Sequence, residues 1–281
     1  INDIHFAAWV ESIGDHRIYN ENLLRWGNSA IDKVIALLRA LGEPTADTTL
    51  IEMVDEGHNV RAIRDRLFQD DRVIRSSRTE WALRDWGYPE YTNVAGLVAR
   101  QIAENGGAIQ FADLASHLAG TFGIAEDTTR AQVRTPLFSL VGNQVRLRGI
   151  DEPRPRTELL AKTPNVFNHS DRVSWLHRID GETLRGSSRP IPNIVATMLG
   201  IGPGEEQTYR SATGSLALSW PDTSITGARC GSIRSLAFLT GMGDGDYLRL
   251  DFIRSTQAVD VTPFTASKFA TSRLGVLQDA T

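Results

Sequence analysis

Scarce cysteine and the absence of long apolar runs limit what this chain of 281 residues can be. Cys230 is its only cysteine, so the chain cannot form an internal disulfide. A single cysteine also cannot build a zinc site by itself. No apolar run approaches the roughly 20 residues of a membrane helix, and no secretory signal pattern opens the chain. We therefore expect a cytoplasmic protein without membrane contact. Because the first residue is Ile1 and not methionine, we also expect a longer protein with a further N-terminal region.

Catalytic signatures are missing as well. The six histidines show neither H-E-x-x-H nor H-x-H spacing, and the chain contains no G-x-S-x-G, Walker or D…E-x-K pattern. The glycine-rich stretch from Gly241 to Asp246 lacks the lysine of a phosphate loop, which favours a turn. His169, Ser170 and Asp171 are adjacent in sequence, but geometry and not adjacency defines a catalytic triad. We expect no enzymatic activity, no cofactor and no metal site.

Lysine is rare, and the charge is carried mostly by arginine. Three lysines accompany 27 arginines, and the net charge of -4 with a pI near 5.9 argues against a uniformly basic nucleic-acid binder. Local clustering is more informative than the total. Between Thr128 and Arg156 there are six arginines and only two acidic residues, Asp151 and Glu152. This segment is the strongest basic cluster in the sequence.

Helical periodicity begins near Asn28. Apolar residues recur at helical spacing behind a Ser29 cap up to Leu41, and Gly42 with Pro44 ends the run. Two further helices are predicted over residues 48–56, ended by Gly57, and over residues 59–69, capped by Asn59. Residues 72–75 and 78–83 then form a strand, a Ser76-Ser77 turn and a strand. In the third helix we expect a buried set of four residues, namely Val60, Ile63, Leu67 and Phe68.

The same order returns downstream. A helix capped by Thr92, a short strand at 108–110 and a helix at 111–122 lead to a third helix opened by Glu126 and Asp127. Strands at 138–141 and 144–148 follow, separated by Gly142-Asn143, which suits a two-residue turn. The third helices align at an offset of 70 residues, so Leu67/Leu137 and Phe68/Phe138 are predicted core pairs, while Arg64 and Arg134 face outward.

A family resemblance rests on this second unit. Its GGAIQFADLASHL helix start and its LVGNQVRLRG hairpin are similar to the HARE-HTH type of winged helix. That family occurs beside bacterial RNA polymerase, in restriction systems and in chromatin factors, and the resemblance implies binding to DNA or to a protein. Pro136 departs from the pattern and should end the third helix before Leu137.

Basic and polar side chains on the third helices and hairpins are the predicted contacts with duplex DNA. They are Arg130, Arg134, Gln144, Arg146 and Arg148 in the second unit and Arg61, Arg64, Arg75 and Arg78 in the first. Two alternatives remain open, because winged helices also dock on proteins and exposed arginines are often only solvated surface.

The composition changes after Ile150. The proline-interrupted stretch from Asp151 to Arg156 predicts a linker, and short strands follow at 172–179, 207–211, 215–220 and 247–254. Two stretches in this region repeat the order of loop, short helix, glycine turn and strand. A helix followed by Gly245-Asp246 and a strand resembles cradle-loop and pseudobarrel folds, which include DNA-binding domains.

The two Gly-Ser-x-Arg loops are the sharpest local features of this third region. A helix N-terminus with a serine hydroxyl and an arginine beside it can hold a phosphate oxygen. The predicted binding residues are Arg185, Ser187, Ser188, Arg189, Ser232 and Arg234. The alternative is that Ser187 or Ser188 and Ser232 cap helices while Arg189 and Arg234 pair with nearby carboxylates.

Together these patterns predict an α+β protein with two tandem winged-helix domains followed by a small β-rich barrel-like domain with two short helices. The boundaries are a helical extension (1–27), winged helices (28–88 and 89–150), a linker (151–160), the β-rich domain (161–270) and a tail (271–281). We expect a DNA-binding protein, or the DNA-recognition region of a larger one related to restriction, phage defence or transcription. The alternative is an adaptor that docks on RNA polymerase or a partner subunit.

Overall fold

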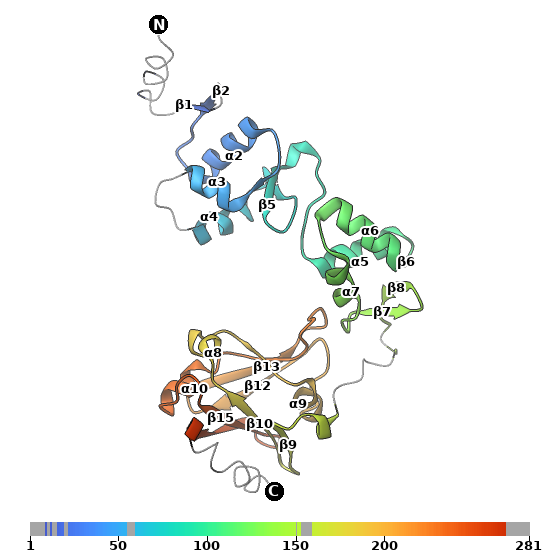
Figure 1. Cartoon of the computed structure of the whole chain (residues 1–281), viewed down its shortest axis with the longest axis vertical. Helices are drawn as coiled ribbons and strands as arrows, with labels where there is room; N and C mark the ends of the chain where they lie inside the picture. The colour runs from blue at the N-terminus through green and yellow to red at the C-terminus, as the bar shows by residue number, and fades with distance from the viewer. Residues whose placement is uncertain are drawn as a thin grey trace. The chain divides into compact units, whose positions relative to one another are not determined.

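The computed structural model describes residues 9, 12, 16–19, 22–54, 60–149, 151–152 and 159–267. Helices and strands are mixed along these ranges, which confirms the α+β class (Figure 1). The chain divides into two compact units, residues 1–130 and residues 131–281. Several predicted features lie outside the described residues: the Gly57 stop, the Asn59 cap, linker residues 153–158 and the tail at 271–281.

A short hairpin precedes the first described helix. β1 (His16–Tyr19) pairs antiparallel with β2 (Asn22–Arg25). Neighbouring side chains of a strand point to opposite faces, and Leu24 is accordingly buried while Leu23 is exposed. The predicted helical extension is therefore wrong over these strands.

Three helices follow, close to the expected positions: α2 (Ala30–Leu41), α3 (Asp47–Val54) and α4 (Val60–Leu67). The Ser29 hydroxyl oxygen accepts the Asp32 N–H at 3.1 Å and caps α2, and Gly42 ends the helix at a φ of 73°. α2 packs against both α3 and α4 (Figure 1). Val34, Leu38 and Leu50 from these helices are completely buried in the same core.

A small sheet completes this first helix–hairpin module (residues 30–83). Its strands are β3 (Thr45–Ala46), β4 (Val73–Arg75) and β5 (Glu80–Leu83), in the order β3-β5-β4. β4 ends at Arg75 and β5 begins at Glu80, so the turn spans the four residues between them and is longer than predicted. Trp81 and Leu83 point from the central strand into the core.

Phe68 corrects the predicted core. Ile63 and Leu67 are buried as expected, but Phe68 is 61% exposed and Val60 is exposed as well. Phe68 lies four residues after Arg64, and its N–H still donates to the Arg64 carbonyl, so it shares the outer side of α4 with Arg64 and not the buried side with Ile63 and Leu67. Its ring meets Trp81 edge-on, with the centroids 5.0 Å apart. Phe138, its predicted equivalent, is completely buried.

The second helix–hairpin module (residues 94–147) has the elements α5 (Val94–Glu104), β6 (Ala108–Gln110), α6 (Phe111–Phe122), α7 (Glu126–Val133), β7 (Phe138–Val141) and β8 (Gln144–Leu147). Its strand order is β6-β8-β7. Asn93, and not the predicted Thr92, caps α5, because the Asn93 Oδ1 accepts the Gly96 N–H at 2.8 Å. A short 3-10 helix, η1 (Arg84–Trp86), precedes this module.

The β7–β8 hairpin has the predicted two-residue turn, with Val141 opposite Gln144. Gly142 has a φ of 61°, whereas Asn143 is not among the described residues with positive φ. A positive φ at the first central residue alone is the type II′ arrangement, which suits the twist of a hairpin. α7 ends at Val133, ahead of Pro136, as the missing proline N–H requires.

The C-terminal β-rich region contains one eight-stranded sheet that curls on itself (Figure 1). Its order is β11-β14-β13-β12-β16-β15-β10-β9. The strands are β9 (Val166–Asn168), β10 (Arg172–Arg178), β11 (Arg189–Pro190), β12 (Glu205–Ser211), β13 (Gly214–Trp220), β14 (Arg229–Cys230), β15 (Tyr247–Ile253) and β16 (Ala258–Phe264). The four predicted strands are confirmed as β10, β12, β13 and β15.

Short helices lie between these strands: α8 (Gly181–Arg185), α9 (Asn193–Met198) and α10 (Arg234–Leu239), with the 3-10 helix η2 (Leu160–Lys162) before β9. The two predicted helices correspond to α9 and α10, and α8 was missed. Alternate residues of β15, namely Leu248, Leu250 and Phe252, are completely buried in the core. Tyr209 meets Phe252 edge-on at 5.2 Å between the ring centroids.

Candidate functional site

Some arginines of the first module form contacts with other groups of the chain, and others are exposed. Arg64 is tied to α3, because its Nε donates to the Asp47 Oδ2 at 2.6 Å. Arg75 lies between two aromatic rings, 5.3 Å from the Phe68 centroid and 5.0 Å from the Tyr91 centroid, and its guanidinium donates to the Arg78 carbonyl. The exposed Phe68 therefore holds Arg75, which joins the end of α4 to the β4–β5 turn.

Three other arginines of this module point outward. Arg61 and Arg66 are exposed on α4, and Arg78 is exposed in the β4–β5 turn. Sequence reasoning named Arg61 and Arg78 but missed Arg66, which is near Asp65 in sequence. Arg66 lies four residues after Ala62, on the same side of α4, and both residues are exposed.

In the second module, most of the predicted contact arginines have partners within the chain. Arg130 pairs with Glu126 one helical turn earlier and lies over the Phe111 ring at 4.4 Å. Arg148 donates to the carbonyl oxygens of Pro136 at 2.8 Å and Phe138 at 2.7 Å, which binds the hairpin to the segment after α7. These contacts indicate a structural role for Arg148.

Arg146 forms an ion pair with Glu152. The hydrogen bond from Arg146, together with the Gly149 N–H at 2.9 Å, lowers the pKa of the Glu152 carboxyl to about 2. Arg134 differs from these residues, because it is exposed and no side-chain partner is seen for it among the described residues. Gln144, at the start of β8, is exposed too.

The surface of the β7–β8 hairpin is more apolar than the sequence analysis anticipated. Val141 is 62% exposed on one face of the hairpin, and Leu140 and Leu147 are exposed on the opposite face. Exposed aliphatic side chains add apolar area to a surface that another molecule can contact.

In the β-rich region, the first Gly-Ser-x-Arg loop follows α8 and does not open a helix. α9 begins only at Asn193 and has no side-chain cap, so the predicted serine cap is wrong here and the loop does not lie at a helix N-terminus. Ser187 instead donates to the Glu182 Oε2 at 3.1 Å, and Arg185 pairs with Glu182. Ser188 is exposed.

Arg189 belongs to a largely buried polar chain. It pairs with Asp180, whose Oδ1 accepts the Thr183 hydroxyl at 2.8 Å, and that hydroxyl lies 2.9 Å from the His177 Nε2. Burial, followed by the positive charge of Arg189, lowers the pKa of His177 to about 4, although Asp180 opposes the shift. The pairing with a carboxylate that the sequence-based alternative predicted is confirmed for Arg189.

The fold brings the two Gly-Ser-x-Arg loops together. β11 and β14 pair through Arg189 and Cys230, and a Cβ placed on Gly186 would lie 3.4 Å from the Ser232 Oγ. The second loop leads directly into α10, where the Arg234 N–H donates to the Ser232 Oγ at 3.4 Å and the Arg234 guanidinium lies 5.2 Å from the Phe238 centroid. We call residues 185–188 and 231–234 the twin-loop surface.

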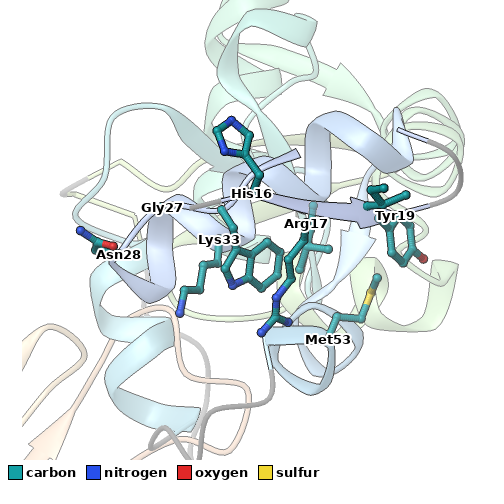
Figure 2. Close-up of a pocket in the computed structure, with 10 residues that line it drawn as sticks. His16, Arg17, Tyr19, Gly27, Asn28, Lys33 and Met53 are labelled. Carbon is teal, nitrogen blue, oxygen red and sulfur yellow. The ribbon is translucent and has the colours of Figure 1, made fainter. Parts of the chain in front are cut away.

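A cavity of about 640 Å³ lies in the first unit, between the β1–β2 hairpin, α2 and α3 (Figure 2). It was not predicted. Arg17 and Lys33 reach toward the same side of it (Figure 2), and both are near the Trp26 ring, with the Arg17 Cζ 4.4 Å and the Lys33 Nζ 5.8 Å from the centroid. The signal in the sequence was Lys33, a rare lysine at a position where the periodicity of α2 requires burial.

Metal binding and membrane insertion have no structural support in the part of the chain that is described. No group of three or more histidine, cysteine, aspartate or glutamate side chains there could hold a metal ion. No helix within the same residues is long and apolar enough to cross a membrane.

Comparison with protein-family models, with curated proteins and with solved structures gives no match to this chain. Function is therefore inferred from the contacts, burial and charge of its own residues.

Proposed function

We propose that this protein binds duplex DNA through its two helix–hairpin modules, each used as a winged helix. The order of three helices and a hairpin in both modules supports this assignment, and in such domains the third helix and the hairpin contact the duplex. The observation that carries the proposal is the contact of Arg75 with both Phe68 and the Arg78 carbonyl.

This contact places the end of α4 beside the β4–β5 turn. The exposed Arg66 and Arg78 consequently belong to neighbouring parts of one surface, and neither shows a carboxylate partner among the described residues. Exposed guanidinium groups at the third helix and the hairpin turn supply the phosphate contacts that position a winged helix. Arg134 and Gln144 are the corresponding exposed groups of the second module.

The twin-loop surface adds a second contact region. Arg234 is exposed there, and the Ser232 hydroxyl of the same loop lies close to its backbone N–H. Serine hydroxyls and backbone N–H groups bind phosphate oxygens in protein–DNA complexes. We propose that this region contacts the same duplex.

Fluorescence anisotropy with a labelled duplex tests the proposal over a range of salt concentrations. Each phosphate contact contributes about 0.9 to the slope of log K against log salt, so Arg66→Ala with Arg78→Ala should weaken binding and reduce that slope by about 2. Arg39→Ala is the matched control, because Arg39 is exposed at the end of α2, away from the proposed contacts. Absence of duplex binding at low salt would refute the proposal.

Protein docking is a second candidate function, favoured by one specific observation. Leu140, Val141 and Leu147 are exposed on the β7–β8 hairpin, while Arg146 and Arg148 bind groups of the chain itself. An apolar hairpin of this kind suits RNA polymerase or a partner subunit better than a phosphate backbone. If docking is the function, Val141→Asp should abolish capture of purified RNA polymerase or that subunit without changing DNA affinity.

A further inference from the structure

The cavity beside the β1–β2 hairpin has features of a built ligand site. Its walls come from β1, from the segment Trp26–Asn28, from α2 through Lys33 and Leu37, and from α3 through Met53 (Figure 2). Its volume of about 640 Å³ falls within the range of roughly 300–1,000 Å³ typical of small-molecule sites.

The indole of Trp26 has an unsatisfied hydrogen-bond donor at this cavity. Trp26 is only 6% exposed, and its Nε1 is buried without an acceptor among the described residues. A buried N–H without a partner costs about 1–3 kcal/mol in a folded protein, so each such group calls for an explanation, of which a bound water, ion or ligand is one. An oxygen atom of a ligand in the cavity would satisfy this donor.

Two positive charges stand beside the same ring. Lys33 is only 6% exposed, which is unusual for lysine, and Arg17 stacks on the indole face. An ammonium group, a guanidinium group and an indole N–H together form a donor set suited to an anionic oxygen.

The remaining walls are mixed. Ile18, Leu37 and Met53 line the cavity with the ring of Tyr19, and His16 and Asn28 add polar groups. An inorganic anion alone would leave the apolar groups without a contact, whereas a ligand with a flat organic body that carries polar atoms would cover both kinds of group.

We propose that this cavity binds a phosphorylated small molecule of nucleotide size. Its phosphate contacts Arg17, Lys33 and the Trp26 N–H, and its ring packs against Tyr19 and Met53. The proposal is independent of DNA binding by the modules. A phosphate of duplex DNA offers the same oxygen chemistry, but Lys33 and the indole N–H are buried, which disfavours contact with the backbone of a bulky duplex.

Isothermal titration calorimetry with the whole chain tests this assignment, using AMP, GMP, CMP and UMP as probes. We expect at least one monophosphate to bind with a Kd below about 1 mM and its nucleoside to bind about tenfold or more weakly. Lys33→Met and Arg17→Ala should each weaken binding about tenfold, and Trp26→Phe should weaken it while retaining the ring.

The control is Arg39→Ala, which removes an arginine of α2 that lines the neighbouring cavity; its affinity for the nucleotide should be unchanged. If Lys33→Met fails to fold by circular dichroism, the exposed Arg17→Ala still decides the question. The proposal is overturned if no monophosphate binds, if nucleosides bind equally well, or if Arg39→Ala has the effect of Arg17→Ala. It is also overturned if Arg17→Ala lowers affinity for duplex DNA while no monophosphate binds, because the cavity then serves a DNA phosphate.

Discussion

Gly186 faces Ser232 across the twin-loop surface, so closely that a Cβ on Gly186 would lie 3.4 Å from the Ser232 Oγ. The two residues are far apart in sequence and approach each other because β11 and β14 pair. The same added atom would lie 3.3 Å from the Arg234 Cδ. The absence of a side chain at Gly186 thus allows the two loops to meet.

Gly186→Ala should therefore affect function as well as stability. Gly186 has a φ of 89°, and alanine in this left-handed region costs about 1–2 kcal/mol. The methyl group should also displace Arg234, so DNA affinity should fall in the anisotropy experiment. Gly200→Ala is the matched control, because Gly200 has a φ of 81° and open space around it. Equal DNA affinities of the two variants would argue against DNA contact at this surface.

Replacement of Glu152 should strengthen DNA binding. Glu152→Gln releases Arg146 from its ion pair, so we expect affinity for duplex DNA to rise about two- to fivefold at low salt. Asp151→Asn changes the net charge equally without breaking this pair, and it should have a smaller effect. A rise of the same size in both variants would mean that only net charge matters and that Arg146 does not contact DNA.

The buried His177 should make the β-rich domain less stable in mild acid. The pKa of His177 is about 4 in the fold and about 6.5 in an unfolded chain, so the unfolded state binds the extra proton between these values. Stability is retained above pH 6.5 and lost as the pH falls toward 4. The loss should be on the order of 3 kcal/mol when complete, measured by urea unfolding.

His177→Gln should remove much of this pH dependence, although it also disturbs the contact with Thr183. The control is His117→Gln, since His117 is exposed on α6. An unchanged slope of stability against pH in His177→Gln would contradict the assignment.

Cys230 should be unreactive in the native protein. Its side chain is completely buried, and this burial raises the pKa of the thiol to about 12, which suppresses the reactive thiolate. We expect a thiol reagent such as 5,5′-dithiobis(2-nitrobenzoic acid) to label it only after unfolding in urea. Rapid labelling in native buffer would show that β14 opens readily.

Local signals in the sequence were sufficient for most helices and strands. Ser29 and Gly42 correctly predicted the start and the end of α2, because helix capping and left-handed glycine conformations depend on only a few neighbouring residues. Gly142-Asn143 placed the β7–β8 turn for the same reason, and Pro136 required an early end to α7. Alternating apolar residues identified β15 correctly, since a strand buries every second side chain.

The alignment of the two modules was a less reliable guide to which side chains are buried. Phe68 and Phe138 align in sequence, but one is exposed against Arg75 and the other is buried. Whether a side chain enters the core depends on where its helix ends and on which strand lies opposite. An alignment of two segments does not contain that information.

The sequence by itself determined the α+β class, the repeated order of elements and the positions of the arginines. Only the tertiary structure decided which arginines remain exposed, because ion pairs such as Arg146–Glu152 and Arg189–Asp180 depend on how the chain turns back on itself. It also decided that the two Gly-Ser loops meet and that Trp26 and Lys33 border a cavity. These contacts join elements from different parts of the chain, and local propensity and periodicity describe only neighbouring residues.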